Sequence, residues 1–336
     1  MNQYKRFWWL QLICLCFSLA AFAEDTPFAK SLEEIDATMA KFHYNPEQLA
    51  SEEYKMIQMN VAEMAQKAES RADFISSFNQ LWHSGPFSHV RIDEMHQPAS
   101  ALADYLDNMQ VGGKGALLTW HENTAVLTVN TMMGTDTIAQ IEAAYKAITA
   151  NNADALIIDL RANTGGAFAV KPLVGHLTNS PLDAGVFVSQ KWHATHDTPP
   201  TKAQLQTVSP WSGWSIKAFW RDAQDNMMTR VQFEPLLPHY AGPVYVLTSK
   251  QTASAAELAV DALKQLPHVT VVGEKTAGEM LSQKMYDITG GFQLYVPIAD
   301  YYSVQSGRIE GVGVRPHKKS TEQDAMSTAM ALAARG

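Results

Sequence analysis

The chain has almost no cysteine. Of its 336 residues only Cys14 and Cys16 are cysteines, and both lie close to the N-terminus. Beyond that segment the chain cannot use a cysteine nucleophile, a cysteine-ligated metal or a disulfide. Its stability therefore has to come from an ordinary hydrophobic core.

Clusters of positive charge are also missing. The formal net charge is -8, and no block of Lys and Arg occurs. Nucleic acids and anionic membrane surfaces attract basic patches, so this composition argues against both as partners. With 46% hydrophobic residues the chain is of the globular class. Its length suits two units of roughly 100–200 residues each.

A long apolar run is found only at the N-terminus, in "MNQYKRFWWLQLICLCFSLAAFAED". Two basic residues precede the run Phe7–Ala20, and small residues stand at 21 and 23, which is typical of a secretory signal peptide. The run is short for a membrane span of about 20 residues. Ile13 and Leu15, before the cysteines, do not fit a lipoprotein site. We predict a signal peptide over 1–23, a mature chain from Glu24 in the periplasm or outside the cell, and no stable membrane anchor after cleavage.

The segment from Pro27 to Trp82 has apolar residues at helical spacing, as in "QLASEEYKMIQMNVAEMAQKA" and "ADFISSFNQLW". Ser31 stands three residues before Glu34, which predicts a capping box at a helix start. These patterns predict a small N-terminal helical subdomain and linker over 24–106.

After two glycines at 112 and 113 the pattern changes to α/β. Two apolar runs flank "HEN", which predicts a hairpin. Strands are expected at "ALIIDLR", "GVFVSQKW", "GPVYVLTS", "HVTVVGE" and "GFQLYVPIADYYSV", and helices at "DTIAQIEAAYKAITA", "FAVKPLVGHLTN" and from Ala255. Such alternation predicts an α/β core over 107–336. The region from Thr198 to Leu237 has no readable pattern, and we expect long loops there.

Ser254, in "TSKQTASAAELAVDAL", has two interpretations. Its spacing to Glu257 is that of a capping box. A serine at a helix start is also suited to act as a nucleophile, because the free N–H groups there, such as that of Ala255, stabilise an oxyanion. The stretch alone leaves both open.

Gly165 and Gly166, in "IIDLRANTGGAF", follow a predicted buried strand. Two glycines let the backbone turn with exposed N–H groups, as an oxyanion hole requires, although a plain turn has the same pattern. The Lys and Ser/Thr of a phosphate-binding loop are absent.

The candidates for a base are histidines. His89 follows Ser88 just after a turn, whereas His193 and His196 have a spacing that would suit a metal but no nearby acid. Glu310, in "SGRIEGVGVRP", is the candidate for an orienting acid, with a solvated loop acid as the alternative.

Four motifs occur in order: "IIDLRANTGG", "TASAAE", "VVGEKTAG" and "GRIEGVGVRP". Together they resemble the tail-specific, or C-terminal-processing, serine peptidase superfamily, which includes tricorn-type proteases. The resemblance covers about Phe87 to His317. It implies a crotonase- and ClpP-like α/β spiral and identifies Ser254 as the nucleophile.

Two departures from that family indicate a branch. The position of the dyad lysine holds Glu279, and the nearby Lys275 lies four positions earlier. Tricorn-type members use a histidine preceded by serine and a late glutamate, which Ser88, His89 and Glu310 match. The stretch from residue 91 to 115 is too short for the PDZ domain of processing members.

The sequence therefore predicts a secreted serine peptidase with neither metal nor organic cofactor, acting on a peptide or unfolded protein. Ser254 would attack the carbonyl carbon, and His89 would be the base. Glu310 and Ser88 would orient His89. The backbone amides of Gly165 or Gly166 and of Ala255 would hold the oxyanion. A homo-oligomer stays open. The alternatives are a non-catalytic module binding a hydrophobic ligand and a crotonase-type acyl-CoA enzyme on the same fold.

Overall fold

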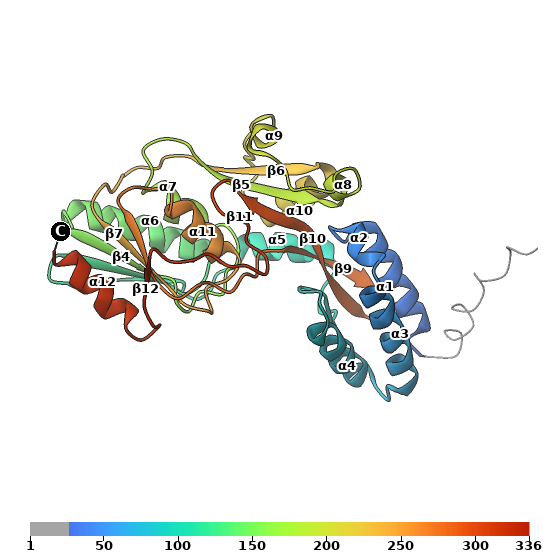
Figure 1. The fold of residues 1–336 in the computed structure, drawn as a ribbon. Helices are drawn as coiled ribbons and strands as arrows, with labels where there is room; N and C mark the ends of the chain where they lie inside the picture. Colours follow the sequence, from blue (N-terminus) through green and yellow to red (C-terminus); the bar gives the residue numbers. More distant parts are fainter. Residues whose placement is uncertain (1–26, 336) are drawn as a thin grey trace, which may run out of the picture.

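The computed structural model describes residues 27–335. The predicted signal peptide, with Cys14 and Cys16, lies outside the described residues. Within them no helix is both long and apolar enough to cross a membrane. Figure 1 shows an elongated arrangement, with a mostly parallel sheet near the C-terminus, a second sheet in the middle and a group of helices at the far end.

The mostly parallel sheet has the strand order β12-β8-β7-β4-β3-β2. Its strands are β2 (Ala116–His121), β3 (Thr124–Val129), β4 (Ala155–Asp159), β7 (Val244–Thr248), β8 (Val269–Gly273) and β12 (Lys318–Lys319). β2 and β3 form the predicted hairpin, and the other pairs are parallel. The carboxyl ends of the neighbours β4 and β7 lie at one edge of the sheet. The loops after these strands, which carry the glycine pair and Ser254, therefore meet there.

Helices cover both faces of this sheet. α6 (Thr135–Ala150), α7 (Val170–Gly175) and α11 (Ala255–Leu263) share the main hydrophobic core with one face. α12 (Ala325–Ala333) covers the other face, where Ala329 packs with Ile157 and Tyr245. Burial on both faces explains the continuous apolar run of β4. The predicted α/β class is confirmed.

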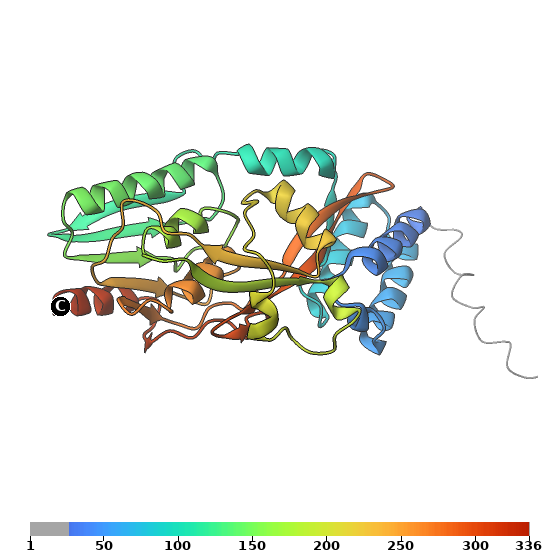
Figure 2. The same cartoon turned by 90° about the horizontal axis from the view of Figure 1, so that it is seen from above.

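The second sheet is antiparallel and has the order β1-β10-β5-β6, with β9 and β11 also paired to β10. Its strands are β1 (Arg91–Glu94), β5 (Leu182–Ser189), β6 (Met228–Phe233), β9 (Ser282–Ile288), β10 (Phe292–Ser303) and β11 (Gly307–Arg308). α5 (Ala99–Asn108) packs against α10 (Ile216–Asp225), which also contacts this sheet. Figure 2 shows α5 and α6 one after the other along one side of the molecule.

The N-terminal helices are α1 (Ala29–Phe42), α2 (Pro46–Leu49), α3 (Glu52–Lys67) and α4 (Arg71–Ser84). Ser51 and Ser70 cap α3 and α4 through their side chains. The apolar faces of these helices pack with Ile288, Phe292 and Leu294 of β9 and β10. The helical region therefore shares its core with strands from the C-terminal third of the chain.

The capping box predicted at Ser31 is wrong. α1 begins at Ala29, so Ser31 lies inside the helix and is buried. Its hydroxyl donates to the carbonyl oxygen of Thr289 at 2.7 Å, and the Thr289 amide donates to Glu34 at 2.6 Å. The two polar side chains thus bind α1 to the β9–β10 turn, because that turn offers partners that the sequence spacing cannot reveal.

The region from Thr198 to Leu237 contains more regular structure than predicted. Besides loops it holds α9 (Lys202–Gln206), α10 and β6. The helix expected over "FAVKPLVGHLTN" is reduced to α7, and "QKWH" forms a short helix, α8 (Gln190–His193), at the end of β5.

Candidate active site

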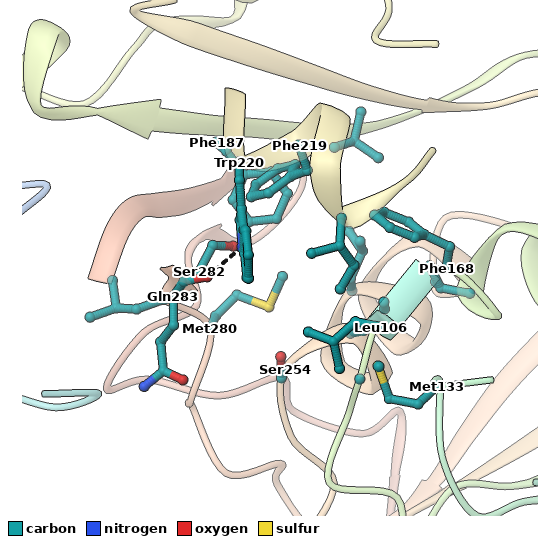
Figure 3. A pocket seen from close by; sticks show the side chains of 18 of the residues that line it. Leu106, Met133, Phe168, Phe187, Phe219, Trp220, Ser254, Met280, Ser282 and Gln283 are labelled. Atoms are coloured by element: carbon teal, nitrogen blue, oxygen red, sulfur yellow. Dashed lines mark hydrogen bonds between the residues drawn. The ribbon is translucent and has the colours of Figure 1, made fainter. Parts of the chain in front are cut away.

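Ser254 lies between the loop after β7 and the start of α11. Its backbone has φ 54° and ψ -125°, a region that side-chain-bearing residues rarely adopt. The Thr252 hydroxyl donates to the Leu160 carbonyl oxygen at 2.9 Å, and the Ala253 amide donates to the Asn163 carbonyl oxygen at 3.1 Å. The loop after β7 is therefore held against the loop after β4, and Figure 3 shows the Ser254 hydroxyl pointing into a cavity.

Glu257 fixes the backbone around this serine. Its buried carboxylate accepts from the Ser254 amide at 3.1 Å, the Thr276 hydroxyl at 2.5 Å and the amides of Gly278 and Glu279 at 2.8 Å each. Burial raises the pKa of the carboxyl group, and these hydrogen bonds oppose that rise. The capping spacing in the sequence thus marks a carboxylate that joins the start of α11 to the loop after β8.

The backbone amides of Gly165 and Gly166 differ in their hydrogen bonding. The Gly165 amide donates to Oδ1 of Asn163 at 2.8 Å, so it is already engaged. The Gly166 amide and the Ala255 amide donate to no other residue within 27–335. Of the two glycines predicted as oxyanion donors, Gly165 thus has its amide engaged by Asn163 in this structure, whereas the Gly166 amide is not engaged by another described residue.

Asn163 is a positioning residue that the sequence did not single out. Its side chain is fully buried, and Nδ2 donates to the Val129 carbonyl oxygen at 2.9 Å while Oδ1 holds the Gly165 amide. Its own carbonyl oxygen accepts from Ala253, next to Ser254. One asparagine therefore ties the end of β3 to both loops of the site.

His89 also has a positive φ, 66°. Its Nδ1 lies 2.9 Å from the Ser88 Oγ, and the Ser88 hydroxyl donates to Oε1 of Glu310 at 2.6 Å. Because the serine proton goes to the carboxylate, the serine oxygen is left to accept, and the imidazole proton is assigned to Nδ1. This tautomer leaves a lone pair on Nε2.

Glu310 is well anchored at this position. Its Oε2 accepts from the amides of Met280 at 2.5 Å and Leu281 at 3.1 Å. Its Oε1 lies 3.9 Å from Nδ1 of His89, and its side chain is only 9% exposed. The predicted grouping of His89, Ser88 and Glu310 is present, and two backbone amides from the loop before β9 complete it.

Burial lowers the pKa of His89, and the carboxylates of Glu310 and Glu279 partly oppose that shift. The imidazole is therefore neutral at neutral pH. A neutral imidazole with a free Nε2 can accept a proton.

A cavity of about 480 Å³ brings the candidates together. His89, Ser254, Gly166 and Ala255 all line it. The remaining residues that line the cavity are mostly apolar and include Leu106, Phe168, Phe187, Trp211, Trp214, Phe219, Trp220 and Met280. An apolar cavity with a few polar groups on one side is the usual form of a small-ligand or substrate site.

The other candidates lie elsewhere. Lys275 is exposed and is not among the lining residues, whereas Glu279 is. His193 and His196 line a separate cavity of about 250 Å³. Within residues 27–335 no group of three or more His, Cys, Asp and Glu side chains is placed to hold a metal ion.

The chain resembles known proteins over this same region. The sequence model of peptidase family S41 matches residues 123–320. A carboxyl-terminal-processing protease of Synechocystis sp. is 28% identical over 165 residues, which are 49% of this chain and 30% of the relative. The matched segment thus spans under a third of that relative's length.

Two solved structures share the fold. A putative peptidase from Parabacteroides merdae has a TM-score of 0.63 at 14% identity, covering 92% of this chain and 97% of that one. A photosystem II D1 C-terminal processing protease has a TM-score of 0.56 at 13% identity, covering 87% and 93%. At such identities the likeness concerns the fold alone.

Proposed function

The chain belongs to peptidase family S41, and from this premise we propose that it is a serine peptidase that cleaves peptide bonds through an acyl-enzyme on Ser254. The observation that supports this most is the shared cavity. It contains a strained serine at a helix start, two unpaired amides, and a neutral histidine whose free nitrogen is set by a buried carboxylate.

In the first step the Ser254 Oγ attacks the carbonyl carbon, and Nε2 of His89 takes the hydroxyl proton. The carbonyl π electrons move to the oxygen, and the amides of Gly166 and Ala255 donate to this oxyanion. The carboxylate of Glu310, acting through Ser88, stabilises the imidazolium.

In the second step the oxyanion electrons re-form the carbonyl, the C–N bond breaks, and the imidazolium gives its proton to the leaving amine. A water molecule then attacks the acyl-enzyme, with His89 again as base, and releases the carboxylic acid and the free serine. These reaction steps require no metal and no organic cofactor.

Two further features support the tricorn-like branch of the family, which has no PDZ domain. Between β1 and β2 the chain contains only α5. Glu279, which the motif resemblance places at the position of the processing members' lysine, lines the cavity. The N-terminal sequence supports export to the periplasm or outside the cell, and a mature mass starting at Glu24 is the measurement that tests it.

A non-catalytic module that binds a hydrophobic ligand is the second candidate. The aromatic lining of the cavity favours it, because such side chains also suit a small apolar molecule. The two candidates differ in whether the serine is activated.

A fluorophosphonate should add once to the native protein, with the Ser254 Oγ bonding to phosphorus and fluoride leaving. Activation by the neutral His89 is the reason, since an ordinary serine hydroxyl is a weak nucleophile. Intact mass should show one adduct, lost in Ser254→Ala. The matched control is Ser282→Ala, because Ser282 is a second serine lining the same cavity. Absence of an adduct on the folded native protein would favour the ligand-binding module.

The pH dependence should report the link from His89 to Glu310. A base must be neutral, so kcat/KM should rise with pH through the His89 pKa, and burial places this limb below the ordinary value of about 6.5. Glu310→Gln removes a charge that raises the His89 pKa. The rising part of the pH profile should then move to still lower pH. The rate at its plateau should fall by about 10–10², less than the 10²–10⁴ that removal of the base itself typically costs.

Ser88→Ala is the companion variant, because it cuts the hydrogen-bonded link while leaving Glu310 bonded to Met280 and Leu281. Like Glu310→Gln, Ser88→Ala should lower the plateau value of kcat/KM. An unmoved limb in Glu310→Gln would mean that Glu310 only holds the loop.

A further inference from the structure

Six aromatic residues line the cavity of Ser254 and are here called the aromatic wall: Phe168, Phe187, Trp211, Trp214, Phe219 and Trp220. Figure 3 shows Phe187, Phe219 and Trp220 across the cavity from Ser254, with Phe168 to one side. Three tryptophans and one phenylalanine of the wall come from the 211–220 stretch, whose sequence gave no readable pattern.

The wall is held in a fixed arrangement. Nε1 of Trp211 donates to Asp222 at 2.9 Å, and Nε1 of Trp220 donates to the Gln283 carbonyl oxygen at 2.8 Å. Ring centroids lie 5.5 Å apart for Trp211 and Phe219, and 4.9 Å apart for Phe187 and Phe219. With these N–H groups bonded elsewhere, the wall offers mainly apolar ring surface to an occupant.

Charge is scarce around this cavity. Among its lining residues in the described chain, only His89 and Glu279 are ionisable, and none is Lys or Arg. The nearby Lys171 has its ammonium 5.4 Å from the Trp214 ring centroid but does not line the cavity. A substrate carboxylate entering it would meet no cationic partner and would be repelled by Glu279, and burying an unpaired charge is strongly unfavourable.

We propose that this site selects peptides with a large apolar or aromatic side chain on the residue whose carbonyl Ser254 attacks, and that it cleaves within a chain rather than next to a free C-terminal carboxylate. The proposal rests on the proposed peptidase function. The aromatic wall receives the side chain, and the lack of a cationic partner disfavours a terminal carboxylate.

Quenched fluorescent peptides test both parts. One series varies the acyl-side residue among Phe, Leu, Ala and Asp, and a second keeps Phe and places either one residue or several residues after the scissile bond. We expect kcat/KM for Phe to exceed that for Ala by at least about 10²-fold, since a single methylene in an apolar pocket already gives about tenfold or more. The substrate with one residue and a free carboxylate should be slower by about tenfold or more.

Trp214→Ala tests the wall itself, because Trp214 is only half-buried and the fold should tolerate the change. The Phe-to-Ala preference should fall about tenfold, because kcat/KM for the Phe peptide should fall more than kcat/KM for the Ala peptide. Trp120→Ala is the matched control, since Trp120 is 36% exposed on β2 and outside the cavity. Ile216→Ala, which also shortens a half-buried lining residue, replaces Trp214→Ala if that variant fails to fold.

The outcomes separate the two proposals. If Ser254 neither labels nor cleaves any peptide, the peptidase function fails. If Ser254 labels but all peptides are cut equally, or small residues or terminal carboxylates are preferred, the selectivity proposal alone is overturned. A preference for aromatic residues only on the leaving side would also overturn it.

Discussion

Replacing His89 with alanine should lower kcat/KM for peptide hydrolysis by about 10³–10⁴, close to the level left by the oxyanion donors alone. His89 lines the cavity of Ser254, and its neighbours Ser88 and Glu310 set the tautomer that frees Nε2. No lysine among residues 27–335 lines this cavity, so a Ser–Lys dyad has no candidate base there. Steady-state kinetics on an apolar quenched peptide would measure the loss.

Lys275→Ala is the matched control for this prediction. Lys275 is exposed and lies outside the cavity, so its removal should change the rate little. The positive φ of His89 can be adopted by alanine only with strain, so His89→Asn, which tolerates such a backbone better, should accompany the test. If His89→Ala and His89→Asn both kept most activity while Lys275→Ala was inactive, a Ser–Lys mechanism would replace the one proposed.

The sequence predicted the elements of the parallel sheet well, because their signals are local. Runs such as "ALIIDLR" are apolar throughout where both faces are buried, and β4 indeed lies between covered faces. The hairpin of β2 and β3 followed from two apolar runs and a short polar turn. The resemblance to the C-terminal-processing peptidases is likewise confirmed by the S41 match over residues 123–320.

Contacts between distant segments were harder to predict. The sequence named Ser88 and Glu310, but their hydrogen bond joins residues 222 positions apart, and only the fold shows that it forms. The capping box assigned to Ser31 failed for the same reason, since its partner Thr289 belongs to another part of the chain. Local spacing cannot distinguish a helix cap from a tertiary hydrogen bond.

The aromatic wall was missed for a related reason. Trp211 and Trp214 stand among Pro, Ser and Gly, which show no strand or helix period. Their positions depend on packing against Phe168 and Phe219 from other elements. The hydrogen bond from the Gly165 amide to Asn163 was not predicted either, because Asn163 lies two residues away in a turn with no regular pattern.

Alanine at either glycine of the pair should reduce kcat/KM by about 10²–10³, because it displaces either the nucleophile or a donor amide, and loss of one oxyanion donor alone costs about that much. At Gly165, where φ is 98°, an added Cβ would lie 2.5 Å from the Ser254 Cβ and would displace the nucleophile. At Gly166, where φ is 136°, it would lie 2.6 Å from the Met133 backbone nitrogen and would move the donor amide.

The control must share the backbone strain without the contacts. Gly112 has φ 73° and open space around its Cβ position, so Gly112→Ala places a side chain at a positive φ away from the cavity and without a clash. Thermal unfolding of all three variants separates loss of fold from loss of turnover. Fluorophosphonate labelling separates the two glycines, because Gly165→Ala should slow it by moving Ser254 itself. Unchanged turnover in both folded variants, relative to Gly112→Ala, would show that the pair only forms a turn and that the oxyanion donors lie elsewhere.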